Sequence, residues 1–291
     1  MKPPPFEYYD PESVGEALAL VAELGDDAKV LAGGQSLVPL LNFRLARPAA
    51  LVDLNRIGEL DTIAADGRSI RIGAMTRQAT LERSREVAAR IPLLTECVRF
   101  IGHTQIRNRG TVGGSVAHAD PAAELPLVLT TLEARFELVS ASGRRSLTGE
   151  ELFVTHLTTA IAPDELLVRI DVDVPPTGTG WAFEEFARRH GDFALGGAAV
   201  LLRFDAGGAV ETVRIGMLAA ADTPLRAHGA EQALQGAKVD EATAEEAAEL
   251  AVADVAPTGD IHGGTEYRRG LLRAMVRRAL LAASVRARGG R

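Results

Sequence analysis

Cysteine is almost absent from this sequence, because Cys97 is the single thiol in 291 residues. One thiol cannot close an internal disulfide, and it cannot supply the four thiolates that an iron–sulfur cluster needs. Any such cluster would therefore belong to another chain. An excess of positive charge is also missing, since 32 Lys and Arg residues against 39 Asp and Glu residues give a formal net charge of -7. A chain of this charge has no global field that attracts the phosphate backbone of a nucleic acid.

Long apolar runs are missing as well. Runs such as residues 125–129 (LPLVL) fall far short of the roughly 20 residues that a membrane-spanning helix needs. The first ten residues (MKPPPFEYYD) are rich in proline and lack the basic and apolar regions of an export signal. We therefore expect a cytoplasmic protein without a transmembrane segment.

The composition that is present is typical of a soluble globular protein, with 46% apolar and 24% charged residues. At roughly 150 residues per domain, this length predicts about two domains, each able to bury a core. Apolar residues at helical spacing predict a helix over residues 13–24, which a capping box of Ser13 and Glu16 begins and Gly25 ends. With strands at 29–31 and 50–54, the first 55 or so residues form a small β-α-β unit that contains an irregular loop.

The rest of the chain divides at residues 175–180 (PPTGTG), a cluster that breaks both helix and strand. Before it, we predict a strand at 70–72, helices over 77–89, 93–101 and 122–132, and strands at 134–139, 144–147 and 166–174. After it, we predict strands at 181–189, 198–204 and 210–218, and helices over 241–252 and 266–285. The expected domains are therefore residues 1–56, 57–177 and 178–291.

Two short segments each place adjacent glycines beside a hydroxyl, namely residues 31–36 (LAGGQS) and 111–115 (TVGGS). Paired glycines can take positive φ and leave their amides bare, so that successive N–H groups converge on an anion such as a diphosphate. The alternative for each pair is a simple turn. The dinucleotide motif G-x-G-x-x-G and the phosphate motif G-x-x-x-x-G-K-[ST] are both absent.

Four segments in their order along the chain resemble the FAD-binding subunit of the molybdenum hydroxylases, which is the medium subunit of carbon monoxide dehydrogenase and of related xanthine and aromatic-substrate dehydrogenases. They are residues 32–44 (AGGQSLVPLLNFR) with 51–57 (LVDLNRI), 106–126 (IRNRGTVGGSVAHADPAAELP), 188–197 (RRHGDFALGG) and 260–271 (DIHGGTEYRRGL). The resemblance implies an α+β fold of the vanillyl-alcohol-oxidase (PCMH) type. Two N-terminal α+β subdomains would hold FAD, and a C-terminal domain of three antiparallel strands and helices would pack against them.

The resemblance also assigns site residues. The residues that would hold the FAD diphosphate are Ala32, Gly33, Gly34, Gln35 and Ser36 in the first motif and Thr111, Val112, Gly113, Gly114 and Ser115 in the second. Glu124 would reach the ribose or ribityl hydroxyls, at a position where the family often has Asp. Phe193 has two interpretations: an aromatic face beside the isoalloxazine ring, or a core residue in a strand.

Other polar residues have simpler interpretations. His103, His118 and Asp120 lack the spacing of a metal site or a hydrolytic triad, so we expect them to form hydrogen bonds around the second motif. We expect Arg188 and Arg189 to be solvated strand residues and Cys97 to be buried and inert. The basic residues of the last helix could face solvent or an acidic neighbouring subunit, and these are Arg268, Arg269, Arg273, Arg277 and Arg278.

The function that the resemblance implies is electron transfer within a complex. Substrate would be oxidised on a large molybdopterin subunit, electrons would cross the 2Fe-2S clusters of a small subunit, and FAD on this chain would pass them to an external acceptor. The assembly would be a dimer of heterotrimers, and no side chain of this chain need act as an acid or a base. A self-contained flavoprotein reductase of the same fold, such as the one that makes UDP-N-acetylmuramate, and a cofactor-free scaffold subunit stay open as alternatives. The sequence identifies neither the substrate nor the electron acceptor.

Overall fold

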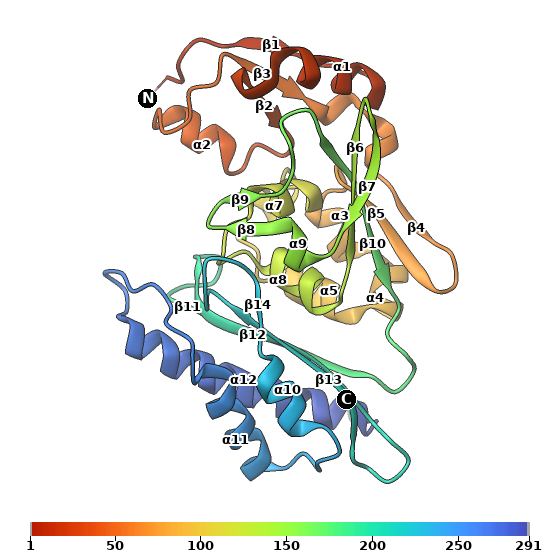
Figure 1. Ribbon diagram of the computed structural model, residues 1–291, viewed down its shortest axis with the longest axis vertical. Coiled ribbons are helices and arrows are strands. Elements are labelled where there is room, and N and C mark those ends of the chain that lie inside the picture. Colours follow the sequence, from red (N-terminus) through yellow and green to blue (C-terminus); the bar gives the residue numbers. More distant parts are fainter. Residues whose placement is uncertain (1, 290–291) are drawn as a thin grey trace.

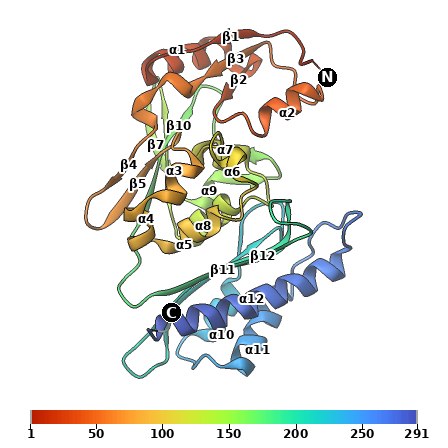
Figure 2. The ribbon, with the colours of Figure 1, turned by 180° about the vertical axis from the view of Figure 1, so that it is seen from behind.

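Three layers follow one another along the longest axis of the molecule, and the chain passes through them in order (Figures 1 and 2). The computed structural model describes residues 2–289. Each layer contains one main β-sheet, of three, five and four strands. We call these the first, second and third sheets.

The first sheet is entirely parallel, with the strand order β1 (Glu7–Tyr9), β3 (Ala50–Asp53), β2 (Ala28–Leu31). Helix α1 (Val14–Leu24) confirms the predicted helix, and Gly25 ends it with φ of 53°. Only half of the predicted capping box forms: the Ser13 hydroxyl accepts the Glu16 amide, whereas the Glu16 carboxylate accepts the Glu12 amide. The predicted irregular loop contains the short helix α2 (Leu37–Asn42).

The second sheet is antiparallel, and helices cover it on the side of the third sheet (Figure 1). Its strands in spatial order are β4 (Ile63–Ala65), β5 (Ser69–Gly73), β10 (Leu166–Asp173), β6 (Arg135–Ser140) and β7 (Gly143–Leu147). Its helices are α3 (Gln78–Arg83), α4 (Arg85–Arg90), α5 (Pro92–Val98), α6 (Thr104–Arg107), α7 (Val112–His118), α8 (Glu124–Thr131) and α9 (Gly149–Leu152). The helix predicted over 77–89 is divided at Ser84, whose hydroxyl caps α4. A small ribbon of β8 (Phe153–Thr155) and β9 (Thr158–Thr159) completes this layer.

The third sheet is antiparallel and contains β11 (Gly180–Ala187), β12 (Ala194–Phe204), β13 (Val210–Leu218) and the two-residue β14 (Leu225–Arg226), which adds to the three predicted strands. Helices α10 (His228–Leu234), α11 (Glu241–Val252) and α12 (Thr265–Ala287) cover its outer face (Figure 2). Two basic residues of α12 pair with acids of α11. Arg273 pairs with Glu249, and Arg277 pairs with Glu241 and Glu245. Arg273 and Arg277 therefore have acidic partners within the chain, while Arg273 and Arg278 are also exposed, as the solvent-facing interpretation expected, and the acidic neighbouring subunit stays a prediction.

The described residues form three apolar cores, two of which span neighbouring layers, since the core of the first layer includes Val139 and Leu166 of the second sheet and the largest core includes Phe183 and Leu201 of the third. The largest lies between the second and third sheets and includes Cys97, which is fully buried as predicted. Burial raises the pKa of Cys97 well above its ordinary value. The division into 1–56, 57–177 and 178–291 stays a prediction. No helix among residues 2–289 is long and apolar enough to cross a membrane.

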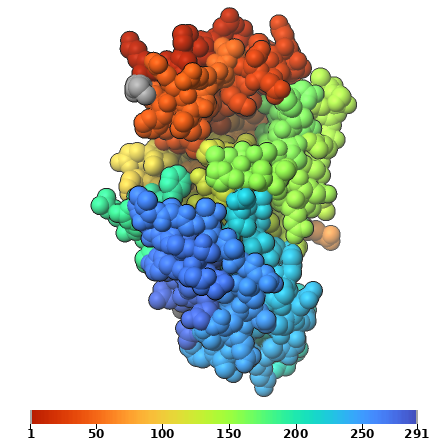
Figure 3. Space-filling view, turned by 60° about the vertical axis from the view of Figure 1, so that its left-hand side comes forward, coloured from red at the N-terminus to blue at the C-terminus, as the bar shows by residue number. Residues whose placement is uncertain are grey.

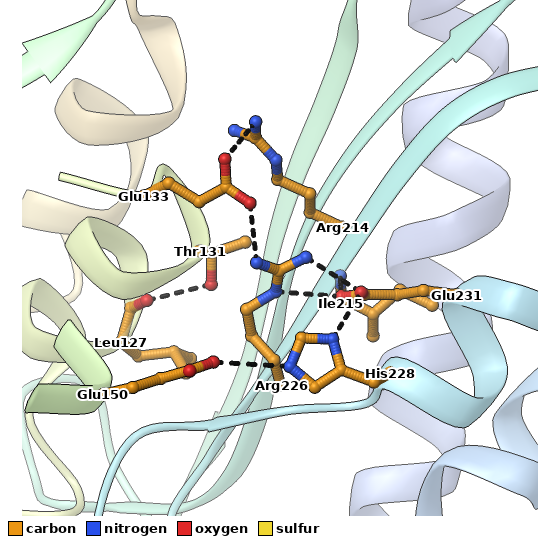
Figure 4. Close-up of polar contacts among 9 residues, drawn as sticks. All are labelled: Leu127, Thr131, Glu133, Glu150, Arg214, Ile215, Arg226, His228 and Glu231. Atoms are coloured by element: carbon orange, nitrogen blue, oxygen red, sulfur yellow. Dashed lines mark hydrogen bonds and ion pairs between the residues drawn. The ribbon is translucent and has the colours of Figure 1, made fainter. Parts of the chain in front are cut away.

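An ion-pair network joins the second layer to the third sheet (Figure 4). Glu133, two residues after α8 ends, pairs with Arg226 at 2.8 Å and with Arg214 at 2.5 Å. Arg226 also pairs with Glu231 at 2.8 Å, and Glu231 accepts the backbone amide of Ile215 on β13 at 2.8 Å. The network fixes the end of α8 against β13.

Candidate functional site

A cleft of about 590 Å³ receives residues from all three layers. In the space-filling view, the yellow and green middle layer lies between the red and orange N-terminal layer and the blue C-terminal layer (Figure 3). Eleven of the twelve predicted site residues line this cleft: Ala32, Gly33, Gly34, Gln35, Ser36, Thr111, Gly113, Gly114, Ser115, Glu124 and Phe193. The exception is Val112, whose side chain is fully buried in the core of the second layer. A second, more open hollow of about 620 Å³ beside α3 contains none of the twelve.

The first glycine motif presents a row of free amides to the cleft. Among residues 2–289, no acceptor takes a hydrogen bond from the backbone N–H groups of Gly33, Gly34, Gln35 or Ser36. Gly34 has φ of 72°, the left-handed conformation that favours glycine. The Ser36 hydroxyl makes no capping bond to α2. Four amides and one hydroxyl are therefore available to an anion.

The second glycine motif is built differently, and the prediction that it is a loop of bare amides with positive φ is wrong. Gly113 and Gly114 lie in the first turn of α7. The Gly113 amide donates to the Ala74 carbonyl at 2.8 Å, and the Gly114 amide donates to the Thr111 hydroxyl at 3.0 Å. A Cβ on Gly113 would lie 2.5 Å from that of Ala74, so close packing, and not φ, requires this glycine. The Ser115 hydroxyl makes no hydrogen bond within residues 2–289 and stays available to the cleft.

The first glycine motif packs against the second motif and against the residues just before it. A Cβ on Gly33 would lie 2.3 Å from the Arg109 carbonyl oxygen, and one on Gly114 would lie 3.2 Å from the Ala32 methyl group. The approach at Gly33 leaves no room for a side chain and the one at Gly114 is tight, so the glycines bring the free amides of one segment beside the helix start of the other.

Two residues that sequence reasoning missed hold this contact in place. Asn55 donates to the Ala32 carbonyl at 2.9 Å, and Arg77 donates to the Asn55 side-chain oxygen at 2.6 Å. Arg77 also donates to the Arg109 carbonyl. Asn55 lies in the segment LVDLNRI that carries part of the resemblance, so that segment was the available signal.

Glu124 begins α8 and lines the cleft with its side chain almost fully buried. Within residues 2–289 its carboxyl group makes no hydrogen bond to another side chain, and burial raises its pKa from 4.5 to about 7. Behind it on β11 lies Glu185, which sequence reasoning also missed. Burial and the charge of Glu124 raise the pKa of Glu185 to about 8, and its Oε2 atom is buried without a partner in the described part of the chain. Within the described residues, the cleft therefore holds a buried carboxyl group to which no other side chain donates a hydrogen bond.

Phe193 stands at the mouth of the cleft, one residue before β12 begins. Its side chain is 76% exposed, so its interpretation as a core residue is wrong. On the facing loop, His103 lies with its ring centroid 6.3 Å from that of His190. His118 lines the cleft, and burial lowers its pKa. The Asp120 carboxylate accepts the Ala122 amide at 2.8 Å, which holds the turn before α8.

Comparison with known proteins covers nearly the whole chain. Residues 4–175 match the family described as "FAD binding domain in molybdopterin dehydrogenase", and residues 181–283 match "CO dehydrogenase flavoprotein C-terminal domain". The chain is 46% identical over 288 residues to the 6-hydroxypseudooxynicotine dehydrogenase complex subunit alpha of Paenarthrobacter nicotinovorans, covering 99% of this chain and 97% of that one. It is 42% identical to the carbon monoxide dehydrogenase medium chain of Hydrogenophaga pseudoflava, covering 98% and 99%.

Solved structures agree with the sequence comparison. A structure of carbon monoxide dehydrogenase from Hydrogenophaga pseudoflava, which lacks the Mo-pyranopterin moiety of the molybdenum cofactor, superposes with a TM-score of 0.96 at 43% identity, covering 98% of this chain and 99% of that one. Quinoline 2-oxidoreductase from Pseudomonas putida 86 superposes with a TM-score of 0.94 at 38% identity, covering 99% of each chain.

Proposed function

The chain belongs to the FAD-binding medium subunits of the molybdenum hydroxylases, the family of carbon monoxide dehydrogenase, and from this premise we propose that it carries electrons between an iron–sulfur partner chain and an external acceptor. Its fold is the FAD-binding fold that the resemblance implied, followed by the C-terminal domain of the same family. FAD supplies the chemistry of such a relay, because it can take up electrons singly and release two.

The observation that carries the proposal is the row of free amides from Gly33 to Ser36. Gly33 is buried and Gly34 is half-buried, and amides in such positions are costly to leave without an acceptor, so these two amides in particular support a bound ligand. A diphosphate is the part of FAD that fits, since it is anionic and accepts several hydrogen bonds at once. The overall charge of -7 does not oppose this binding, because the backbone dipoles act locally.

The remaining site residues take separate roles in the proposal. Ala32 to Ser36, together with Gly114 and Ser115, would face the diphosphate, whereas Thr111, Val112 and Gly113 build the start of α7 that supports it. The Glu124 carboxyl group would accept hydrogen bonds from the ribose or ribityl hydroxyls, since no other side chain among residues 2–289 donates to it. Phe193 would stand beside the isoalloxazine ring at the mouth of the cleft and restrict access to it.

The partners follow from the same premise. Relatives are named as a medium chain and as a subunit of a dehydrogenase complex. We propose that this chain assembles with a large molybdopterin subunit and a small iron–sulfur subunit, as a dimer of such heterotrimers in the cytoplasm. The protein's own part is to bind and orient the flavin, and none of its side chains needs to move a proton.

The test uses the complex purified from its native host with this chain tagged. Wild-type complex and a variant that lacks flavin are both reduced chemically, and the absorbance of the iron–sulfur clusters is followed after an external acceptor is added. We expect clusters in both complexes to become reduced, but only the flavin-containing complex to be reoxidised rapidly. Equal reoxidation without flavin would contradict the relay. Reduction of the lone flavin-bearing chain by a nicotinamide would favour a self-contained reductase instead.

A further inference from the structure

Gln78 lines the cleft with a side-chain amide that makes no hydrogen bond to any residue that the structure describes. It is the first residue of α3 and is only 5% exposed. Its Oε1 atom is buried without a partner, and its Nε2 group donates to no acceptor among residues 2–289. Burial takes such an amide out of water, and the lost hydrogen bonds are costly unless others replace them. An unpaired amide on the wall of a cleft therefore indicates a contact with a ligand.

The backbone around Gln78 is fixed by the segment that begins the second glycine motif. The backbone N–H of Gln78 donates to the Gly110 carbonyl at 2.9 Å, and the preceding Arg77 forms an antiparallel bridge with Thr111. Neighbouring side chains in such an extended pairing point to opposite sides. Accordingly, Arg77 lines the open hollow beside α3, whereas Gln78 lines the cleft. The fold therefore holds the Gln78 side chain toward the cleft before any ligand binds.

The same side chain lies close to the free amides of the first motif. A Cβ on Gly110 would lie 2.5 Å from Oε1 of Gln78, so the absence of a side chain at Gly110 makes room for the amide. Gly110 is also in contact with Gly33, since a Cβ on Gly33 would lie 2.7 Å from the Gly110 Cα atom. Only Gly110 therefore separates Gln78 from the row of free N–H groups that begins at Gly33.

We propose that Gln78 is a further diphosphate-binding residue, whose Nε2 group donates a hydrogen bond to a diphosphate oxygen of FAD, and this proposal rests on the proposed function. The place beside the free amides favours an anionic ligand atom, to which only the nitrogen of the amide can donate. Oε1 is sealed against Gly110, which leaves Nε2 as the atom that can reach the ligand. The alternative is a turned amide, in which Oε1 accepts a hydrogen bond from a cofactor hydroxyl.

The test measures cofactor binding to the complex, purified through a tag on this chain and stripped of flavin. FAD is added back, and its binding is followed by flavin fluorescence. Gln78→Met keeps the length of the side chain but cannot donate a hydrogen bond, and it should raise the Kd for FAD about ten-fold. The matched control is Gln232→Met, which changes an exposed glutamine on α10 outside the cleft and should leave the Kd unchanged.

Fragments of the cofactor show which part of FAD contacts Gln78. ADP carries the diphosphate, whereas adenosine and riboflavin together carry every sugar and ribityl hydroxyl but no phosphate. The affinity of each fragment is measured by competition with FAD. Gln78→Met should weaken ADP about as much as FAD and leave adenosine and riboflavin unchanged. A loss for adenosine or riboflavin with ADP unaffected would overturn the assignment to the diphosphate, because the amide would then contact a hydroxyl.

A purely structural role for Gln78 would give a different pattern. Removing an unpaired buried amide relieves a cost, so in the flavin-free complex residues 76–83 of Gln78→Met should exchange their backbone hydrogens no faster than in the wild type. Faster exchange there, together with an equal loss for all three fragments, would overturn the proposal. Gln78→Asn provides a second variant, because it keeps the amide but withdraws it by one methylene, and it should weaken FAD and ADP alike.

The outcomes separate this contact from the proposed function. Equal FAD affinity in the wild type and in both Gln78 variants would overturn the contact and leave the proposed function intact. A wild-type complex that binds no FAD would instead contradict the proposed function itself. The result we expect is tight binding of FAD by the wild type and by Gln232→Met, with a loss in both Gln78 variants that ADP reproduces.

Discussion

Gly33 and Arg109, 76 residues apart, approach so closely that a Cβ on Gly33 would lie 2.3 Å from the Arg109 carbonyl oxygen. This contact joins the free amides of the first motif to the segment that begins the second. Neither motif forms the cleft alone. The first motif supplies the free amides, and the second lines the cleft beside them.

The first prediction concerns this contact. Gly33→Ala should push the two segments apart, cost about 1–3 kcal/mol of folding free energy, and lower the FAD content of the complex. The content is measured by releasing the flavin and comparing it with the amount of this chain. Gly270→Ala is the matched control, because a Cβ there meets nothing within 4 Å on the exposed side of α12. An unchanged FAD content in Gly33→Ala would show that the close approach is dispensable.

The second prediction concerns the protonation of Glu124. Its pKa is about 7 in the folded chain against an ordinary value of 4.5. Because the folded value is the higher one, the stabilisation is complete below pH 4.5 and is lost as the pH rises through 7. In flavin-free protein at pH 8, Glu124→Gln should therefore be more stable to urea than the wild type, by about 1–3 kcal/mol.

The same residue should act in the opposite direction on the cofactor. Glu124→Gln loses a strong acceptor for the FAD hydroxyls and should bind FAD more weakly than the wild type, as measured by flavin fluorescence during titration. Glu124→Asp keeps a carboxyl group and introduces the residue that is common in the family, so it should bind FAD with most of the wild-type affinity. Equal FAD affinity in all three proteins would remove Glu124 from the binding site.

Phe193 should control access to the flavin. Phe193→Ala removes a side chain that is 76% exposed, so the unfolding free energy should change by less than about 0.5 kcal/mol. FAD content should stay the same, while the relative rates of flavin reoxidation by large and small acceptors should shift. Phe186→Ala, which changes a partly exposed phenylalanine on β11, provides the comparison. Identical acceptor profiles for Phe193→Ala and the wild type would separate Phe193 from the flavin.

The network in Figure 4 should contribute to stability. Arg226→Ala leaves Glu231, which is 8% exposed, without its main cation and should cost about 2–4 kcal/mol in urea unfolding. Arg144→Ala breaks a pair in which the arginine is 70% exposed, and it should cost less than about 1 kcal/mol. Comparable losses in the two variants would mean that burial does not set the strength of these pairs.

Long periodic elements were predictable from the sequence. The helix expected over 241–252 coincides with α11, and the three long strands of the third sheet overlap the predicted ranges. The expectation that Arg188 and Arg189 are strand residues is wrong, because β11 ends at Ala187. Elements of few residues were missed, because their stability comes from distant partners. Strand β1 exists through its pairing with β3 some 43 residues later (Glu7 with Ala50), and α2 has only six residues, too few to form a stable helix alone.

The sequence predicted residues that line one cleft, but it did not predict how they pack, and their role toward FAD stays a prediction. Nothing local distinguishes Gly34, which needs positive φ, from Gly113, which needs to pack against Ala74. The partnership of Glu124 and Glu185 also has no signal in the sequence, because 61 positions separate them and each alone resembles an ordinary surface acid. Burial creates their altered pKa values, and burial depends on how the second and third layers pack.

The most direct measurement of the central claim is the flavin content of the intact complex, purified through a tag on this chain from its native host. The flavin is released, identified by mass and counted against each polypeptide. The account predicts one FAD per copy of this chain and a loss of that FAD in the Gly33→Ala variant. A complex with all its chains but without FAD, or with FAD that persists when this chain is removed, would contradict the account.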